Sequence, residues 1–277
     1  MRNALSIDLE FWHSGEPFSE YVRSQPENQV EASIKPMLEI LRRHDVHATF
    51  FVLGEVAEKH PELIKKIYED GHEIASHGFT HRRLHLSDKT TFMNDISRSI
   101  NILTSLTGER PIGYRAPSFS LDNSTVWALN VMKAQGFLYD SSVYPVKMRF
   151  YGEPRVPLGP YHPSSDDITK IDDTNTFLEF PVTAYAFGTK HVPISGGFSL
   201  RMIPMKFIVA ALRKINQERP ALIYLHPWEL YAETPRLDLP FLWRVTSYYN
   251  IDRLLWKLDR LMQHIKFTTI RETLCLP

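Results

Sequence analysis

The apolar residues of this chain fall into short continuous runs that are separated by longer stretches of helical spacing. The runs are bounded by turn residues and rich in β-branched and aromatic side chains, which is typical of buried strands. They lie at residues 4–9, 46–52, 72–76, 112–114, 137–139 and 221–225. The stretches that predict helices lie at residues 33–43, 62–69, 88–106, 122–135 and 205–217. Strands that alternate with helices in this way predict βαβ units and a parallel sheet.

Three regions depart from this alternation. Residues 11–30 are polar and aromatic and predict a long loop over the mouth of the fold. Residues 145–200 contain many Pro, Gly and Asp, so we expect an insertion of loops and short strands that covers one side of a barrel. The tail predicts helix over residues 241–264 and a last strand at 266–269. A length of 277 residues suits one α/β barrel domain over residues 1–277.

Composition narrows the class of protein. Apolar residues make up 43% of the chain, and 32 Lys and Arg balance 32 Asp and Glu, so bulk charge indicates neither a nucleic-acid nor an anionic-membrane partner. The chain shows no apolar run of signal-peptide or membrane-spanning length, and its one cysteine, Cys275, cannot form an intrachain disulfide. We therefore expect a cytoplasmic protein.

Ionisable side chains follow several of the predicted strands. These residues are Asp8, Glu10, His77, His81, Arg115, Asp140 and His226. Parallel α/β folds bind ligands beyond the carboxyl ends of their strands, so we expect these groups to share one rim of the barrel. Structural alternatives remain open: Asp8 and Glu10 could mark where a strand meets water. Arg115 could form a buried salt bridge, Asp140 could lie in a cap or turn, and His226 could be a buried, hydrogen-bonded histidine.

His77 and His81 are spaced so that both imidazoles can face one point, which suits a divalent cation. The spacing alone is weak evidence. In a chain with 12 histidines the number of such pairs expected by chance is roughly one half, and His81 with His85 forms a second pair. The context favours the first pair, since Gly78 allows a sharp bend and the hydroxyls of the two residues beside the histidines, Ser76 and Thr80, are candidate hydrogen-bond partners.

The motifs also resemble those of the polysaccharide deacetylase family with the NodB-homology domain, carbohydrate esterase family 4. The five segments that carry the resemblance, in the family's order, are Ser6–Glu10, Ser76–His81, Arg115–Pro117, Asp140–Ser142 and Leu225–His226. The resemblance covers roughly residues 3–230. Residues 226–229 and the tail look like those of the bacterial deacetylases that are found with exopolysaccharide biosynthesis. It implies a distorted (β/α) barrel of the NodB-homology type, with about seven parallel strands, a loop-rich insertion over about 145–200 and a helical C-terminal extension over about 240–277.

The resemblance also implies roles for these residues. Glu10, His77 and His81 would bind one divalent metal ion, zinc by expectation, with cobalt or nickel as alternatives. Asp8 would be the catalytic base with Arg115 as its charge partner, and His226 the general acid with Asp140 as its partner. The backbone N–H of Ser118 would hold the oxyanion.

One departure keeps alternatives open. The family usually has adjacent aspartates in its first motif, whereas here Leu9 separates Asp8 from Glu10, so the two roles could be exchanged, and a metal-free variant remains an alternative. The resemblance implies a metal-dependent N-deacetylase, a hydrolase of C–N bonds other than peptide bonds, that acts on an N-acetylated saccharide of a bacterial polysaccharide or its precursor. The alternatives are an amidohydrolase of the same fold that acts on a ureide or formamido sugar, and a non-catalytic carbohydrate-binding protein. The sequence does not give the oligomeric state.

Overall fold

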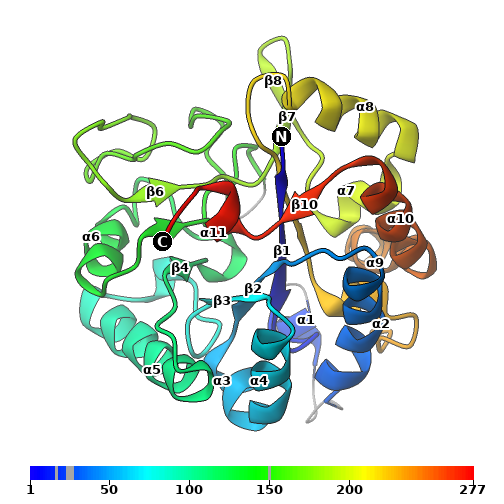
Figure 1. Ribbon diagram of the computed structural model, residues 1–277, viewed down its shortest axis with the longest axis horizontal. Helices are drawn as coiled ribbons and strands as arrows, with labels where there is room; N and C mark the ends of the chain where they lie inside the picture. Colours follow the sequence, from blue (N-terminus) through cyan, green and yellow to red (C-terminus); the bar gives the residue numbers. More distant parts are fainter. Residues whose placement is uncertain (16–17, 23–27, 149–150) are drawn as a thin grey trace.

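A curled parallel sheet forms the centre of the protein, as the computed structural model shows for residues 1–15, 18–22, 28–148 and 151–277 (Figure 1). Seven strands lie in the order β6–β5–β4–β3–β2–β1–β9, and an eighth, β10, pairs with the start of β1; all these pairings are parallel. Their bounds are β1 (Asn3–Leu9), β2 (Thr49–Val52), β3 (Glu73–Ser76), β4 (Gly113–Tyr114), β5 (Tyr139–Asp140), β6 (Leu178–Glu179), β9 (Leu222–Leu225) and β10 (Phe267–Thr268). The predicted α/β barrel is confirmed.

The two edge strands of the sheet, β6 and β9, are joined through the chain that follows β6. The sheet therefore closes into a barrel, although the two strands do not pair directly. The chain that follows β6 returns to β9, where the amide of Thr183 donates to the carbonyl of Leu222 at 3.2 Å. The amide of Tyr224 donates to the carbonyl of Ser195 at 3.0 Å. The strand ends on either side of this seam therefore face the same rim.

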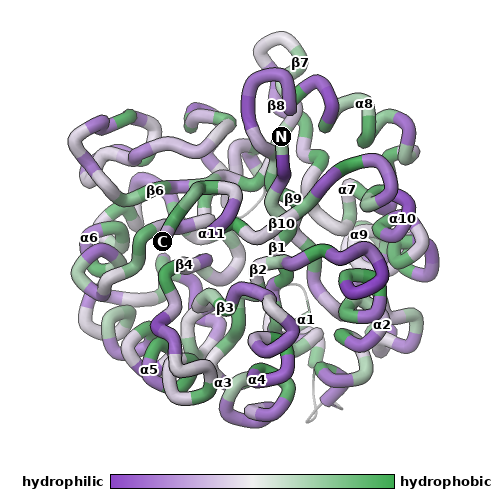
Figure 2. The backbone as a smooth tube through the Cα atoms, viewed as in Figure 1, coloured by the Kyte–Doolittle hydropathy of each residue, from purple (hydrophilic) through white to green (hydrophobic). Residues whose placement is uncertain are grey.

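Helices cover the outside of the sheet, and the longer ones bury an apolar stripe. The larger ones are α2 (Val30–Arg43), α3 (Gly54–Lys59), α4 (Pro61–Glu69), α5 (Lys89–Thr107), α6 (Trp127–Ala134), α7 (Gly197–Met202), α8 (Met205–Ile215), α9 (Phe241–Tyr248) and α10 (Ile251–His264). Figure 2 shows hydrophobic positions along the central strands and alternating hydrophilic and hydrophobic positions along the outer helices. No helix among the described residues is long and apolar enough to cross a bilayer.

Short elements complete the chain. They are the helices α1 (Phe18–Tyr21) and α11 (Ile270–Thr273), the 3-10 turns η1 (Leu84–Leu86), η2 (Pro117–Phe119) and η3 (Pro227–Leu230), and the antiparallel hairpin β7 (Ala184–Phe187) with β8 (Lys190–Pro193).

Local signals in the sequence set the ends of α5. The side chain of Asp88 accepts a hydrogen bond from the amide of Thr91 at 2.7 Å, which caps the first turn, and Gly108 ends the helix at a φ of 74°. A left-handed Asn250, with a φ of 58°, divides the predicted helix 241–264 into α9 and α10, a break that the apolar spacing does not reveal.

The region 145–200 differs from its prediction in one respect. We expected its short strands only to cover the barrel, but β6 pairs with β5 and is a strand of the central sheet. The hairpin β7–β8 does form a separate two-stranded sheet. β6 is only two residues long, too short for alternation to show, so its place depends on pairing with β5. Residues 149–150, within this region, and residues 16–17 and 23–27, within the predicted loop 11–30, lie outside the described part of the chain.

Candidate functional site

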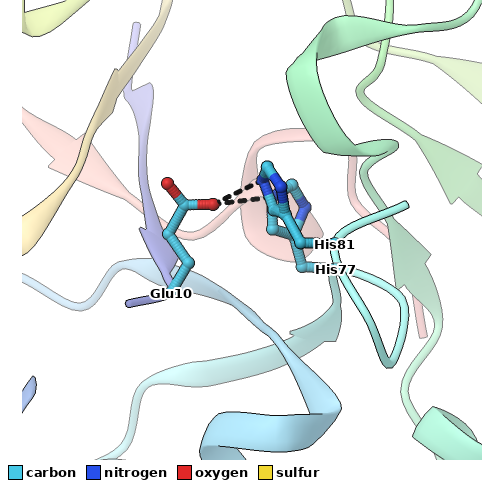
Figure 3. A group of neighbouring side chains, drawn as sticks. All are labelled: Glu10, His77 and His81. Atoms are coloured by element: carbon cyan, nitrogen blue, oxygen red, sulfur yellow. Dashed lines mark ion pairs between the residues drawn. The ribbon is translucent and has the colours of Figure 1, made fainter. Parts of the chain in front are cut away.

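Three side chains from the ends of β1 and β3, the two strands on either side of β2, converge on one point. Glu10 directly follows β1, and His77 and His81 follow β3 on a tight bend where Gly78 has a φ of 76°. Figure 3 shows the Glu10 carboxylate facing both imidazole rings. Nε2 of His81 lies 2.6 Å from Oε2 of Glu10, and Nε2 of His77 lies 3.6 Å from the same oxygen. One ligand atom from each residue lies within 4.8 Å of the others, so the three can share one cation.

The hydrogen bonds around these atoms fit a metal site. Nδ1 of His77 lies 2.8 Å from the carbonyl of Arg115 and donates to it, which leaves the lone pair of Nε2 directed at the shared point. Oε2 of Glu10 is buried and makes no well-directed hydrogen bond with the described residues, although a ring nitrogen is close. Burial opposes the ionisation of Glu10, but the charge of His81 and the nearby ring of His77 hold the pKa of Glu10 well below its usual value. An ionised carboxylate and two imidazoles form a donor set that zinc prefers.

The bend between the two histidines is held by a residue that the sequence did not single out. Asp95 on α5 accepts hydrogen bonds from the amide of Phe79 at 2.7 Å and from the hydroxyl of Thr80 at 2.7 Å. The hydroxyl of Ser76 contacts Ser99 and accepts from the amide of Gly78. The prediction that Ser76 and Thr80 contact the histidines is therefore wrong, since both hydroxyls fix the backbone of the bend.

Asp8 and Arg115 form a buried pair next to this cluster. Nη1 of Arg115 donates to Oδ1 of Asp8 at 2.6 Å, and its Nε and Nη2 donate to the carbonyl and hydroxyl of Ser141. Arg115 is fully buried, and its guanidinium lies 4.1 Å from the ring centroid of Phe51. The structure therefore brings together the two side chains that were predicted to pair.

His226 completes the rim from the end of β9. Its Nε2 lies 3.8 Å from Oδ2 of Asp8 and 3.7 Å from Oε1 of Glu10, and its Nδ1 donates to Oε2 of Glu229 at 3.0 Å. Burial opposes protonation of the ring, but the hydrogen bond to Glu229 and the neighbouring carboxylates raise the pKa of His226 to about 9. The hydrogen bond to Glu229 therefore favours the charged form of His226.

The predicted partnership of Asp140 with His226 is wrong. Asp140 accepts hydrogen bonds from the hydroxyl of Ser142 at 2.5 Å and from its amide at 3.2 Å. Its carboxyl group also contacts that of Glu179, and burial raises the pKa of both groups, with the charge of Asp140 raising that of Glu179 further. We infer that Glu179 carries the proton that the two share. The carboxylate that pairs with His226 is Glu229 instead. It lies three residues after His226, in η3, so the partner comes from the same turn and not from a distant strand.

A small cavity opens beside these groups. Its volume is about 160 Å³, and it is lined by Asp8, Glu10, Trp12, Gly15, Phe18, His77, His81, Ala116, Ser118, Phe119, Tyr151, Tyr224, His226, Trp228 and Trp243. Ser118 lies in η2 with a left-handed φ of 55°. The Trp228 ring stacks on the His226 ring at 5.5 Å and 27°. An aromatic wall around a polar floor suits a sugar ring or an acyl group.

A larger cavity, about 460 Å³, lies at the opposite ends of the strands. Its buried carboxylate, Glu73, already accepts hydrogen bonds from Thr49, Tyr139 and the amide of Arg271. We therefore place the chemistry in the smaller cavity.

The chain is similar to known polysaccharide deacetylases. Residues 26–137 match the family model described as "Polysaccharide deacetylase", and residues 141–275 match one described as "Domain of unknown function (DUF3473)". A peptidoglycan-N-acetylglucosamine deacetylase from Bacillus cereus is 34% identical over 120 residues, which cover 39% of this chain and 44% of that protein. The chain spans less than half the length of the first curated relatives that it matches.

Two solved structures show the same fold. Puue allantoinase superposes with a TM-score of 0.60 and 19% identity over 98% of this chain and 87% of that one. A probable polysaccharide deacetylase from Pseudomonas aeruginosa superposes with a TM-score of 0.57 and 19% identity over 98% of this chain and 88% of that one. At these identities the likeness is one of fold, and the argument for activity depends on the side chains.

Proposed function

Because the chain belongs to the polysaccharide deacetylase family, we propose that it is a metal-dependent N-deacetylase that acts on an N-acetylated sugar of a bacterial polysaccharide or its precursor. The observation that carries the proposal is the convergence of Glu10, His77 and His81 beside Asp8 and His226 at one cavity. This set provides a cation site, a base and an acid within a few ångströms of each other.

We assign Glu10, His77 and His81 as the ligands of one divalent ion, with zinc expected and cobalt or nickel as alternatives. A cation held by three protein ligands has a position open to substrate or water, where it polarises a carbonyl and lowers the pKa of the water. The geometry favours Glu10 over Asp8 as the ligand, because only Glu10 lies with both histidines while Asp8 is paired with Arg115.

We assign Asp8 as the base that takes a proton from the attacking water. Arg115 and the cavity wall fix the carboxylate, with Oδ1 engaged by the guanidinium and Oδ2 directed toward His226. A base that is held at hydrogen-bond distance from the water accelerates the reaction through its fixed position as well as through its basicity. We assign the backbone N–H of Ser118, at the wall of the cavity, to the carbonyl oxygen that becomes negative.

His226 is placed to protonate the leaving amine when the C–N bond breaks. Its Nε2 lies 3.8 Å from Oδ2 of the base, and its hydrogen bond to Glu229 favours the charged form of the ring. The acid and base are therefore separate residues with different partners, Glu229 for His226 and Arg115 for Asp8. Glu229 acts through His226 and is a positioning residue.

We also propose that both matched regions form one catalytic domain. The sheet joins β2, β3 and β4 from the first region to β6, β9 and β10 from the second. The site combines His77 and His81 with His226, so neither region alone holds it. Removal of residues 141–277 is expected to abolish folding of the rest. A role in exopolysaccharide biosynthesis remains part of the proposal.

Acetate release from N-acetylglucosamine oligomers tests the activity, with zinc, cobalt or nickel supplied. Asp8→Asn and His226→Ala are expected to lower the rate by about a hundredfold or more, since each removes a proton-transfer group. His85→Ala is the matched control, because His85 pairs with Asp122 outside the cavity. Full activity in both variants would show that the roles are wrong.

The same assay separates the alternative functions. Hydrolysis of a ureide or a formamido sugar without acetate release would indicate a small-amide hydrolase of this fold. Saturable binding of the oligomer without turnover, at every metal tried, would indicate a carbohydrate-binding protein.

A further inference from the structure

A second cavity meets the proposed catalytic cavity at two shared residues. Its volume is about 550 Å³, and His81 and Ser118 line both cavities. Because His81 is assigned to the cation and the N–H of Ser118 to the carbonyl oxygen, the two cavities meet at the reacting group. The other described residues that line the second cavity, which we call the polar groove, are Ser14, Ser19, Thr80, Arg82, Arg83 and Leu86.

The side chains of the polar groove suit a saccharide. Arg82 is exposed, and its Nε donates to the backbone carbonyl of Leu86 at 2.8 Å, which holds the guanidinium at the groove. The side chain of Leu86 is also exposed, and Ser14 and Ser19 add hydroxyl groups. Hydrogen-bonding groups beside an apolar side chain match a sugar ring, which has hydroxyls around its edge and C–H groups on its faces.

Packed aromatic side chains wall the catalytic cavity on one side. They belong to a single cluster, in which Phe18 is 2% exposed, and the members that line the cavity are Trp12, Phe18, Trp228 and Trp243. The ring of Phe18 meets that of Trp228 edge-on, with 5.0 Å between the centroids. Close-packed rings leave no space for a further sugar behind this wall.

A second aromatic wall is made by Phe119, Tyr151 and Tyr224. Phe119 is 6% exposed, and the centroid of its ring lies 4.8 Å from that of Tyr224. Among the described residues, no Trp, Tyr or Phe lines the polar groove. The polar groove is therefore the side on which a saccharide can continue beyond the catalytic cavity.

The sizes of the two cavities support this division. The catalytic cavity, at about 160 Å³, is smaller than the roughly 300–1,000 Å³ that is typical of ligand pockets. It has room for the reacting sugar only, so the rest of a longer substrate has to lie in the polar groove.

We propose that the substrate is an oligosaccharide that binds end-on, with its last N-acetylated sugar in the catalytic cavity and the attached sugars in the polar groove. A chain that crossed the site would need space on both sides of the reacting sugar, and the aromatic walls leave one side. The inference rests on the proposed deacetylase function. One water is added across the amide C–N bond, which gives acetate and a free amine on the last sugar, so each chain loses one acetyl group.

Product analysis with a tetramer of N-acetylglucosamine tests the inference. Mass spectrometry after exhaustive reaction is expected to show the loss of one acetyl group, from a sugar at one end of the chain. We also expect kcat/KM for the tetramer to be about tenfold or more above that for N-acetylglucosamine, because only the tetramer occupies the groove. Loss of acetyl groups from inner sugars, or equal kcat/KM for both substrates, would overturn the inference.

Arg82→Ala and Leu86→Ser test the groove itself. Each is expected to lower the ratio of kcat/KM for the tetramer to that for the monosaccharide about fivefold, whereas general damage to the site would lower both values alike. The matched controls are Arg155→Ala and Ile171→Ser, two exposed residues that line neither cavity. Circular dichroism melts would show that every variant is folded. A ratio at the wild-type value in both groove variants would contradict the assignment of the groove.

Binding without turnover separates this inference from the proposed function. Calorimetric titration of the tetramer into Asp8→Asn is expected to show tighter binding than that of the monosaccharide, and addition of Arg82→Ala is expected to weaken tetramer binding about fivefold. If these differences are found but no substrate releases acetate, the groove is right and the deacetylase activity is wrong. If acetate is released but neither binding nor rate depends on chain length, the activity is right and the groove is wrong.

Discussion

Nδ1 of His226 donates a hydrogen bond to Oε2 of Glu229 across 3.0 Å, within the single turn η3. Glu229 is itself held by Nη2 of Arg201 at 3.2 Å, and an added Cβ at Gly197 would overlap its carboxylate. The proposed general acid is thus supported by a buried carboxylate, and that carboxylate by a buried cation.

Glu229→Gln tests this support. The neutral amide cannot stabilise the charged imidazole, so we expect kcat to fall about 10-fold to 100-fold with little change in KM. Steady-state acetate release measures both constants, and Gly197→Ala should change kcat in the same direction. Unchanged kcat in Glu229→Gln would show that Glu229 does not support the general acid.

Arg201→Met tests the cation behind Glu229. Arg201 is 1% exposed and donates to Glu229 and to backbone carbonyls at the end of α9. Its loss leaves Glu229 buried without a counter-charge, and we expect about 3 kcal/mol lower free energy of unfolding. Urea denaturation measures this value, with the exposed Arg155→Met as control. An effect no larger than the control's would show that the network is not needed for stability.

The shared proton of Asp140 and Glu179 predicts how stability depends on pH. Because burial raises the folded-state pKa of both carboxyl groups, the pair is favourable while protonated and loses stability as pH rises above the unfolded-state values, about 4 to 4.5. Glu179→Gln keeps a donor to Asp140 without the titrating group. Relative to wild type, we expect it to be more stable at pH 8 than at pH 5 by about 1 kcal/mol or more.

Urea denaturation at the two pH values measures that difference, and the exposed Glu62→Gln serves as control. A difference that is equal at both pH values, or of opposite sign, would show that the pair does not share a proton.

The sequence predicted which ionisable residues lie at the strand ends better than it predicted which side chains they contact. Asp8, Glu10, His77 and His81 follow buried strands whose apolar runs are clear, so the convergence of their side chains follows from a parallel sheet. Arg115 was placed beside Asp8 through the family motifs, and the two are in contact.

The missed residues depend on packing between distant parts of the chain. Asp95 lies on the face of α5 that meets the bend after β3, and Arg201 reaches Glu229 only because α7 packs against the end of α9. No local pattern fixes either contact. Glu229 could have been considered from the sequence, since it lies three residues after His226. A carboxylate at that spacing is common, however, so the spacing did not displace Asp140, the partner that the family motifs imply.

The central claim is that Glu10, His77 and His81 hold one cation, and zinc content after gel filtration tests it most directly. We expect about one zinc per chain in the wild type and in the His85→Ala control, and about a tenth of that or less in Glu10→Gln and His81→Ala. Zinc retained at the wild-type level by both ligand variants, or absent from a folded wild type after incubation with zinc, would contradict the account.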